Sequence, residues 1–577
     1  MVFDYSSIPQ EFRRHHLPQG IRFEWEDLSS AYAELSARDV RETAELERWL
    51  LDEAELDSFV YEQRTVRYIR STLQTDDPEA ARAYRQYLDQ LEPKVKLANF
   101  GLLEKYASAQ GRAGLPKDTY GQDEKRRLSA LRIFREANVE LEREDSNLSQ
   151  SYLRTLGAMT VTFRGQERTL QQMSKFYEEP DRGVREEAWR MADARALRDR
   201  AALDGIYDQM VRVRDRVARN SGFANFRDYV FVKRDRFDYT PEDCERFHQG
   251  VEEFMVPLSR EIDRRRSEEL GVGQLRPWDL RVDPSGRRPL APFQDASSLV
   301  AGARKVLRRV DPELGGYFAQ MADLGLLDLE SRKGKAPGGY QEELTEARLP
   351  FIFMNAAQRD TDVRTLHHEA GHSFHTFLMR KQGLPYFNAN ANLPLEFAEV
   401  ASISMEIISG EHYDGVFYGK EDARRSNFEE AAGNVKLFAW VATVDAFQHW
   451  VYTHPDHTQE ERASAWVKTF NRFCGLENYD GIEDSRAYRW HRQLHFFEAP
   501  FYYIEYGIAL TGALGIWSKY RDDRNDAIEA YKSALSLGAS RPVPDLFEAA
   551  GLRWGFGPSE LRGLAEGLRG KIREYQD

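Results

Sequence analysis

The segment His368-Glu369-Ala370-Gly371-His372 has the residue types and the spacing of a metal site on a helix. Positions four apart lie one turn above each other, so His368 and His372 can present two imidazoles to one tetrahedral Zn²⁺ ion. Glu369 lies beside them without being a ligand, and its carboxylate can take a proton from a water molecule that the metal has made acidic. Together these three side chains indicate hydrolysis of an amide bond.

The flanking sequence predicts that this motif lies well inside a helix. The helix begins after Asp360-Thr361, either of which can cap it, and ends before Gly383-Leu384-Pro385. A motif of three fixed residues can also occur by chance. Its position inside a helix favours a metal site over the alternative, which is two buried histidines on an ordinary amphipathic helix.

A catalytic zinc site also needs a third protein ligand and an open fourth position. One known pattern places a third histidine six residues after the second, but Leu378 occupies this position. We expect Glu399 to be the ligand, because it stands 27 residues beyond His372 in a second predicted helix, between Pro394 and Gly410. That distance allows the first helix to end and the second to return alongside it.

Two further polar residues are expected near the metal. Glu406 follows Glu399 by seven positions, about 20° off the same helix face, so it can hold a ligand histidine in place by a hydrogen bond. On the turn after His372, a third imidazole from His375 would crowd the metal; we assign His375 a supporting or packing role, with packing favoured. The alternative, that Glu396, Glu399 and Glu406 are surface charges, conflicts with a helix rich in Ala, Val, Ile and Met, where an unpartnered carboxylate is costly.

The remainder of the chain predicts a mainly α-helical protein. The N-terminal third consists of long, charge-rich segments with apolar periodicity and few Gly or Pro residues. A capping box at Thr240 and Asp243, with Pro241 between them, opens a helix that runs to the glycines near Gly271. The helix before it ends at Asn220-Ser221-Gly222 and is predicted from one buried apolar stripe: Leu203, Ile206, Met210, Val213 and Val217.

Strand signals are few. The segment VTFRGQERTL around Gly165 predicts a small hairpin, and LPFIFMNA predicts a short buried or edge strand around Phe351 to Met354. If this strand is an edge that faces a cleft, the backbone at Phe351 and Phe353 can hydrogen-bond an extended peptide. Two segments rich in Pro or Gly, residues 277–292 and 331–348, are predicted to be loops.

The second of these loops contains Gly338-Gly339, directly before Tyr340. A glycine pair lets a backbone approach a ligand closely or move as a flap, so these three residues belong to the candidate substrate site. An exposed connector is the alternative interpretation.

The composition predicts a globular protein. The chain has 577 residues, which is long enough for two or more domains, and its hydrophobic fraction of 41% is enough for a sizeable core. We expect an N-terminal helical region, residues 1–160, and a catalytic region, residues 161–577. The formal net charge of −14 argues against a general affinity for nucleic acid or anionic lipid, since both need cationic patches.

Further features favour a cytoplasmic protein with no membrane partner. Cys244 and Cys474 are too few for a disulfide framework, and neither has a neighbouring cysteine at metal-ligand spacing, which fits a reducing compartment. The first residues, MVFDYSSIPQEFRRHH, lack the basic start and apolar run of a secretion signal, and no apolar stretch is long enough to cross a bilayer. The sequence does not indicate which oligomeric state the protein has.

Several blocks of the chain resemble one known family. HHEAGHSFH, EFAEVASISME and HFFEAPFYYIEYGIALTGALGIW, in this order, are similar to the thimet oligopeptidase and oligoendopeptidase F group of zinc metallopeptidases, especially its Pz-peptidase-like branch. RNSGFANFRDYV and KAPGGY resemble weaker blocks, and together the similarity extends over roughly residues 160 to 560. The resemblance implies a two-lobed helical fold around a deep, narrow channel with one zinc ion per chain at its floor, which admits only unstructured oligopeptides.

The same resemblance implies roles for the C-terminal block. In this family a histidine and tyrosines stabilise the tetrahedral intermediate, and here they would be His495, Tyr502, Tyr503 and Tyr506. Relatives often space the tyrosines differently, so the sequence leaves open which one faces the substrate. His491 and His495 are four apart and could hold a metal themselves, but no glutamate general base is adjacent.

The sequence therefore predicts a zinc-dependent endopeptidase that cleaves short, unstructured peptides with Glu369 as general base. One rival is a di-iron carboxylate protein of oxidase type, because Glu369-x-x-His372 and Glu245-x-x-His248 have the spacing of such bundles. That interpretation leaves His368 without a role. A second rival is a non-catalytic peptide-binding relative, against which the complete motif argues.

Overall fold

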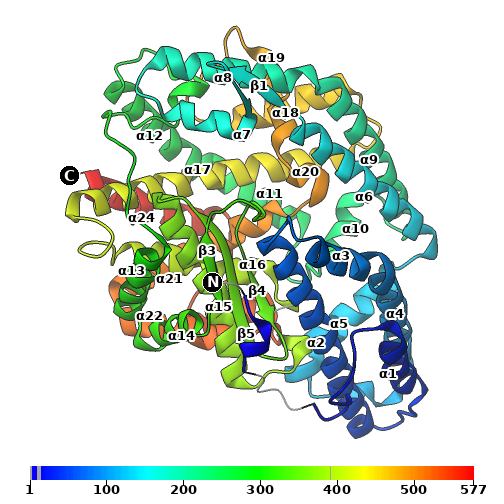
Figure 1. Ribbon diagram of the computed structural model, residues 1–577. Coiled ribbons are helices and arrows are strands. Elements are labelled where there is room, and N and C mark those ends of the chain that lie inside the picture. Colours follow the sequence, from blue (N-terminus) through cyan, green and yellow to red (C-terminus); the bar gives the residue numbers. More distant parts are fainter. Residues whose placement is uncertain (1–2, 10–13, 390–391, 577) are drawn as a thin grey trace. The chain divides into compact units, whose positions relative to one another are not determined.

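The computed structural model describes residues 3–9, 14–389 and 392–576, and within them the chain is mainly helical with two small sheets (Figure 1). This confirms the predicted α class. The chain divides into two compact units, each assembled from three separate stretches. Unit 1 contains Met1–Leu131, Leu290–Asn427 and Gly512–Trp554, and unit 2 contains Arg132–Pro289, Phe428–Thr511 and Gly555–Asp577. The division into regions 1–160 and 161–577 stays a prediction.

The first stretch of unit 1 forms the helices expected from its apolar periodicity. Trp49, Leu56, Phe59 and Tyr106 are fully or nearly fully buried in one core cluster. The helices are α1 (Trp25–Ala37), α2 (Thr43–Leu73), α3 (Pro78–Gln86), α4 (Glu92–Ser108) and α5 (Lys117–Ile133).

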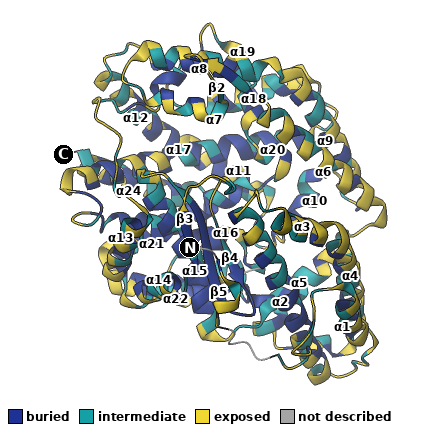
Figure 2. Ribbon diagram, viewed as in Figure 1, coloured by how far each residue is buried: buried dark blue, intermediate teal, exposed yellow. Residues whose placement is uncertain are grey.

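A three-stranded sheet lies at the centre of unit 1. It consists of β3 (Leu327–Glu330), β4 (Tyr340–Leu344) and β5 (Leu349–Ala356) in the order β3-β5-β4, with β5 parallel to β3 and antiparallel to β4. Figure 2 shows these strands largely in the colour of buried residues. Side chains of β5 are buried on both faces of the strand from Leu349 to Met354, and a strand covered on both faces has a continuous hydrophobic run.

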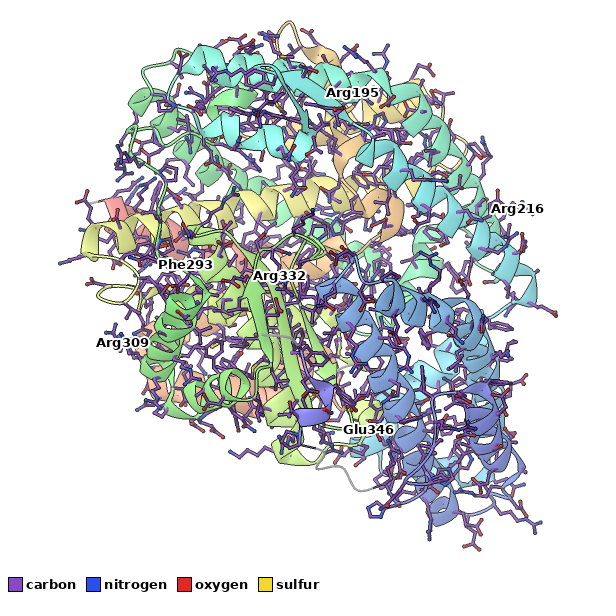
Figure 3. The ribbon with its side chains drawn as sticks, in the orientation of Figure 1. Arg195, Arg216, Phe293, Arg309, Arg332 and Glu346 are labelled. Carbon is purple, nitrogen blue, oxygen red and sulfur yellow. The ribbon has the colours of Figure 1, made fainter. Side chains whose placement is uncertain are left out.

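Salt bridges tie both ends of this sheet to neighbouring parts of unit 1. Arg332 Nη1 lies 2.6 Å from Asp328 Oδ1 at one end, and Glu346 Oε1 lies 2.7 Å from Arg14 Nε at the other. Figure 3 labels Arg332 and Glu346 at these two ends.

The structure corrects the predicted loop at residues 331–348, since β4 lies inside it. The strand was missed because Gln341, Glu342 and Glu343 are consecutive polar residues without the alternation that marks a strand. The other predicted loop, residues 277–292, is irregular apart from a short 3₁₀ turn at Pro277–Asp279.

The two helices predicted to carry the metal site are present, and both end where expected. Helix α15 (Asp360–Gln382) already includes Asp360 and Thr361, so the expectation that one of them caps it is wrong. Instead the Asp362 carboxylate accepts a hydrogen bond from the Arg359 N–H, and the helix ends at Gly383, whose φ is +72°. Helix α16 (Leu395–Gly410) packs along α15. Unit 1 is completed by α13 (Ala296–Val310), α14 (Pro312–Asp323), η7 (Tyr386–Asn388), α22 (Arg524–Ser536) and α23 (Val543–Ala549).

Unit 2 confirms the other sequence-predicted elements. The hairpin around Gly165 is β1 (Thr160–Phe163) and β2 (Gln166–Thr169). On α9 (Arg200–Asn220) the predicted stripe is buried except for Ile206, which is half-buried. The capping box of α11 (Pro241–Gly250) is present, and one π-helical segment, η5 (Val251–Met255), separates it from α12 (Val256–Glu269).

The remaining elements of unit 2 are mostly helices: α6 (Glu136–Gly157), α7 (Leu170–Met173), α8 (Arg182–Arg198), α10 (Phe226–Lys233), α18 (Gln459–Phe473), α19 (Glu483–Ala487), α20 (His495–Glu498) and α24 (Pro558–Gln576). Two long helices, α17 (Lys420–Thr453) and α21 (Tyr503–Asp522), contribute residues to both units. Among the described residues, every helix is too short or too polar to traverse a lipid bilayer.

Candidate active site

Three side chains of unit 1 converge as the sequence predicts for a metal site. His368 Nε2 lies 3.4 Å from Glu399 Oε2, and His372 Nε2 lies 3.8 Å from the same oxygen. The two imidazole centroids are 5.1 Å apart, with their planes at 83°. One ligand atom from each of the three residues falls within 4.8 Å of the others.

Helix packing produces this convergence. His368 and His372 are one turn apart on α15, and α16 passes close enough to bring Glu399 to them. The close approach requires Gly371, because a methyl group there would lie 2.6 Å from the Ala401 carbonyl oxygen and from Cα of Ser402. The glycine inside the motif is therefore a packing residue.

Hydrogen bonds fix the orientation of the three converging side chains. Glu406 Oε2 lies 3.1 Å from Nδ1 of His368, and the Ser402 hydroxyl donates to Glu399 Oε2 at 3.0 Å. The sequence pattern predicted Glu406 in this place, but it did not identify Ser402, although a serine one turn after a glutamate on the same helix is a usable signal.

The donor set fits a zinc ion. Two imidazole nitrogens and one carboxylate oxygen are the ligands of a three-residue catalytic zinc site, which leaves one position for water or substrate. The side chains of His368 and His372 retain 25% and 20% of their exposure, so the cluster is open to solvent on one side.

The charges around the cluster favour a cation. Burial alone would lower the pKa of His368, but Glu399 and Glu406 outweigh this effect and raise it well above the usual value. Burial would likewise raise the pKa of Glu399, but His368, His372 and the Ser402 hydroxyl lower it to about 2. A site that stabilises a proton between two carboxylates also stabilises a divalent metal ion.

Glu369 differs from the other carboxylates of the site. Burial raises its pKa to about 7, and the neighbouring charges of Glu399 and Glu406 add to this effect against the opposing His368. The backbone of Gln341, in β4, hydrogen-bonds its carboxylate. Strand β4 therefore runs beside the candidate general base.

Two more histidines of α15 are buried near the cluster. His375 packs against Phe397, with ring centroids 6.2 Å apart, and neither of its ring nitrogens has a hydrogen-bond partner among the described residues. The supporting or packing role of His375 stays a prediction. His367, which the sequence did not single out, has Nδ1 2.7 Å from the Val363 carbonyl oxygen and 3.2 Å from the Tyr413 hydroxyl.

The predicted substrate loop is anchored to its surroundings. Gly338 has φ +100°, and its carbonyl accepts a hydrogen bond from the Asn355 side chain at 2.9 Å. Gly339 approaches the Phe353 carbonyl, since a methyl group at this glycine would lie 3.4 Å from that oxygen. The Tyr340 ring stacks on Phe353 with centroids 4.7 Å apart.

The expectation that β5 offers an edge to a peptide is wrong. Phe351 and Phe353 are fully buried, and β5 is paired with β3 on one side and β4 on the other. In the described part of the chain, β4 is the outer strand next to Glu369.

The residues of the C-terminal block gather in unit 2. The ring centroids of Tyr502, Tyr503 and Tyr506 lie 5.8, 4.7 and 6.4 Å from that of His495. Burial raises the pKa of Tyr503, whose hydroxyl is hydrogen-bonded by Gln493 and Trp440.

Gln493 also determines the tautomer of the His495 imidazole. Its amide nitrogen lies 2.7 Å from Nδ1 of His495, and an amide NH₂ can only donate. Burial and the charge of Arg234 lower the pKa of His495, so the ring is neutral and carries its proton on Nε2. Gln493 was not predicted as a site residue, because its only signal in the sequence is its place two residues before His495.

The two alternative metal pairs do not form sites. His491 is buried with Nε2 3.2 Å from Asp204 Oδ1, in a separate ion-pair network from His495. Glu245 is exposed, whereas His248 is buried with Nε2 2.9 Å from Asp445 Oδ2. The second ExxH pair of the di-iron interpretation therefore does not present two ligands to one ion.

Known proteins share both the sequence blocks and the fold. Residues 176–556 match the model of Peptidase family M3. The structure of Pz peptidase A with inhibitor 2 has a TM-score of 0.86 and 28% identity to this chain, over 98% of this chain and 99% of that one.

Two relatives match over shorter stretches. Oligopeptidase PepF of Bacillus subtilis is 26% identical over 259 residues, and an oligoendopeptidase F homologue of Borreliella burgdorferi is 25% identical over 272 residues. These matches cover 41% and 45% of this chain, and 36% and 43% of the relatives. The chain thus spans less than half the length of these curated relatives.

The fold and the cluster on α15 and α16 define the class, a helical metallopeptidase fold with an HExxH motif. Because the family model matches well over half of the sequence, the chain belongs to peptidase family M3. The resemblance to the oligoendopeptidase F and Pz-peptidase group is confirmed.

Proposed function

We propose that this protein is a zinc-dependent endopeptidase that hydrolyses internal peptide bonds of short, unstructured oligopeptides. The observation that carries the proposal is the convergence of His368, His372 and Glu399 beside the buried carboxyl of Glu369. Membership of peptidase family M3 supports the same reaction class.

In this proposal, His368, His372 and Glu399 hold one zinc ion per chain. When bound, the ion supplies Lewis acidity, which polarises a peptide carbonyl and brings the pKa of water toward about 7. Glu369 accepts a proton from the attacking water and returns it to the departing amine nitrogen. Burial of Glu369 raises its pKa above that of an ordinary carboxyl group, which favours its acceptance of a proton.

The outer edge of β4 is the proposed binding site for the peptide backbone. The backbone of Gln341 bonds Glu369, so a peptide paired with this edge would pass the general base. Main-chain pairing makes little use of side chains, which fits broad specificity. Gly338, Gly339 and Tyr340 lead into this strand, and Phe351 and Phe353 support it from β5 rather than contacting substrate.

His495 and one of Tyr502, Tyr503 and Tyr506 are proposed to stabilise the developing oxyanion. A neutral imidazole with its proton on Nε2 is a donor that suits this task, and a tyrosine hydroxyl is another. The channel implied by the family, the catalytic region 161–577 and a cytoplasmic location remain predictions of the same proposal.

The test is hydrolysis of an internally quenched peptide, with and without a chelator. We expect turnover, loss of turnover on chelation and recovery on addition of Zn²⁺. The same assay with a folded protein substrate should give no cleavage, because only an extended chain can pair with a strand edge.

Two variants separate the residue roles. Glu369→Gln should keep the metal and lose about 10²–10⁴-fold in kcat, whereas His368→Ala should lose the metal itself. Binding of the peptide by the metal-loaded protein without turnover would instead support the non-catalytic interpretation, and iron content with oxidase activity would support the di-iron one.

A further inference from the structure

Four side chains of types that can bind a metal ion meet in unit 2, apart from the site on α15. Cys244 and His248 are one turn apart on α11, and Asp445 and His449 are one turn apart on α17. Each pair is four residues apart, so each presents both side chains from one helix face. All four residues are buried, with exposed fractions of 0%, 3%, 0% and 6% in this order.

A thiol sulfur, a carboxylate oxygen and an imidazole nitrogen lie close together in this cluster. One ligand atom each from Cys244, Asp445 and His449 lies within 4.8 Å of the other two. His449 Nε2 is 3.2 Å from Asp445 Oδ2, and His248 Nε2 is 2.9 Å from the same oxygen. The imidazole centroids of His248 and His449 are 5.6 Å apart with their planes at 90°.

Three atoms of this cluster are buried without a hydrogen bond. Asp445 Oδ1 and both ring nitrogens of His449 have no hydrogen-bond partner among the described residues. Buried polar atoms are nearly always hydrogen-bonded, because leaving one unpaired costs roughly 1–3 kcal/mol. The second oxygen of Asp445 is already bonded to His248, so the carboxylate is held in a fixed orientation.

From this juxtaposition we propose a structural metal site in which Cys244, Asp445 and His449 bind a divalent transition-metal ion. The donor set, a thiolate, a carboxylate and an imidazole, selects Zn²⁺ among common ions. His248 orients Asp445 by its hydrogen bond, as partners of ligand carboxylates do. The ion would join α11 to α17 within unit 2.

The burial of the ligands distinguishes this site from the candidate active site. A catalytic zinc site keeps an open position, whereas a structural one is closed. His368 and His372 remain partly exposed, but the four residues of this cluster are enclosed. The two sites share no residue, so this inference does not rest on the proposed function.

Cobalt substitution tests the site, because only this site contains sulfur. The chain has two cysteines, so the variant His368→Ala/His372→Ala/Cys474→Ser contains Cys244 as its only thiol and lacks the candidate active site. We expect this variant to bind one equivalent of Co²⁺ and to show a thiolate-to-cobalt charge-transfer band. Cys474→Ser alone is the matched control and should bind metal as the unmodified protein does.

Metal analysis of the purified proteins gives a second readout. The unmodified protein should carry two equivalents of zinc, His368→Ala/His372→Ala one, and Cys244→Ser one, with circular dichroism to verify that each is folded. If the triple variant is folded but shows no thiolate band and no bound metal, the four side chains form only a buried polar network and the inference is wrong. That decision does not depend on whether Cys244→Ser folds.

Discussion

Glu406 Oε2 lies 3.1 Å from Nδ1 of His368, on the side of the ring away from Nε2, which approaches Glu399. The two carboxylates, seven residues apart on α16, thus contact the two nitrogens of one imidazole. A carboxylate that accepts a hydrogen bond from a ligand histidine fixes its tautomer and increases its basicity. Glu406 is therefore a positioning residue for His368.

Glu406→Gln should weaken zinc binding by about 10–100-fold, because an amide holds the Nδ1 proton less strongly than a carboxylate. The measurement is a zinc titration against a competing chelator, with turnover followed in parallel at saturating zinc. Glu421→Gln, an exposed glutamate at the start of α17, is the control. An unchanged zinc affinity in Glu406→Gln would remove Glu406 from the site.

Gly371→Ala should destabilise the protein by about 1–3 kcal/mol, because the added methyl group meets the backbone of α16. Displacement of α16 should also reduce zinc affinity, since this helix carries Glu399. Gly316→Ala provides the control: this helical glycine has nothing within 4 Å of the added methyl, and the change should stabilise by about 0.5–1 kcal/mol. Denaturant unfolding measures both, and equal shifts would contradict the steric explanation.

His495→Phe should lower kcat by about 10²–10³-fold at unchanged zinc content, because the ring is retained but the Nε2 donor is lost. The readouts are kcat, KM and bound zinc. His454→Phe replaces an exposed histidine directly after the end of α17 and should leave all three unchanged. A parallel fall in zinc content would indicate that His495 acts on folding or metal binding and not on the reaction.

Acid should weaken the anchoring of the C-terminal end of α15. Lys381, with Tyr317 and Lys532, lowers the pKa of Glu313 to about 2 from its usual value near 4.5. Because the folded-state pKa is depressed, this contribution is fully present above about pH 4.5 and is lost as pH falls toward about 2. Glu313→Gln should therefore lower stability at neutral pH and reduce the further loss between these two pH values.

The measurement for this prediction is the denaturant midpoint across that range of pH. Glu529→Gln is the control, because Glu529 pairs with the same Lys532 but is 72% exposed, and exposed pairs contribute little. If both variants keep the full acid dependence of the unmodified protein, the network around Glu313 does not cause it.

The sequence predicted the convergence of His368, His372 and Glu399 because the information for it is local. His368 and His372 are one turn apart, and Glu399 lies in a helix whose bounds are marked by Pro394 and Gly410. Two consecutive helices joined by a short loop usually pack side by side, which brings Glu399 close to His368 and His372. The helices of both units could also be predicted from the sequence, since apolar stripes and helix caps depend on residues that are close together in the chain.

Elements that depend on distant partners were not predictable. Strand β4 has a polar sequence and exists because β5 pairs with it. The edge assigned to β5 was wrong for the same reason, since strand order cannot be read from one strand. The cluster of Cys244 and His449 was missed because about two hundred residues separate its halves. Neither half alone has a known ligand pattern.

The discontinuous makeup of unit 1 has a consequence during synthesis on the ribosome. Helix α22 packs on α15, and the Tyr531 hydroxyl donates to the Ala401 carbonyl at 3.0 Å, so the last stretch of unit 1 supports the helices of the cluster. A nascent chain that has emerged only as far as α16 lacks this support. The helices that carry the histidines must therefore wait for translation of α22 before they reach their final packing.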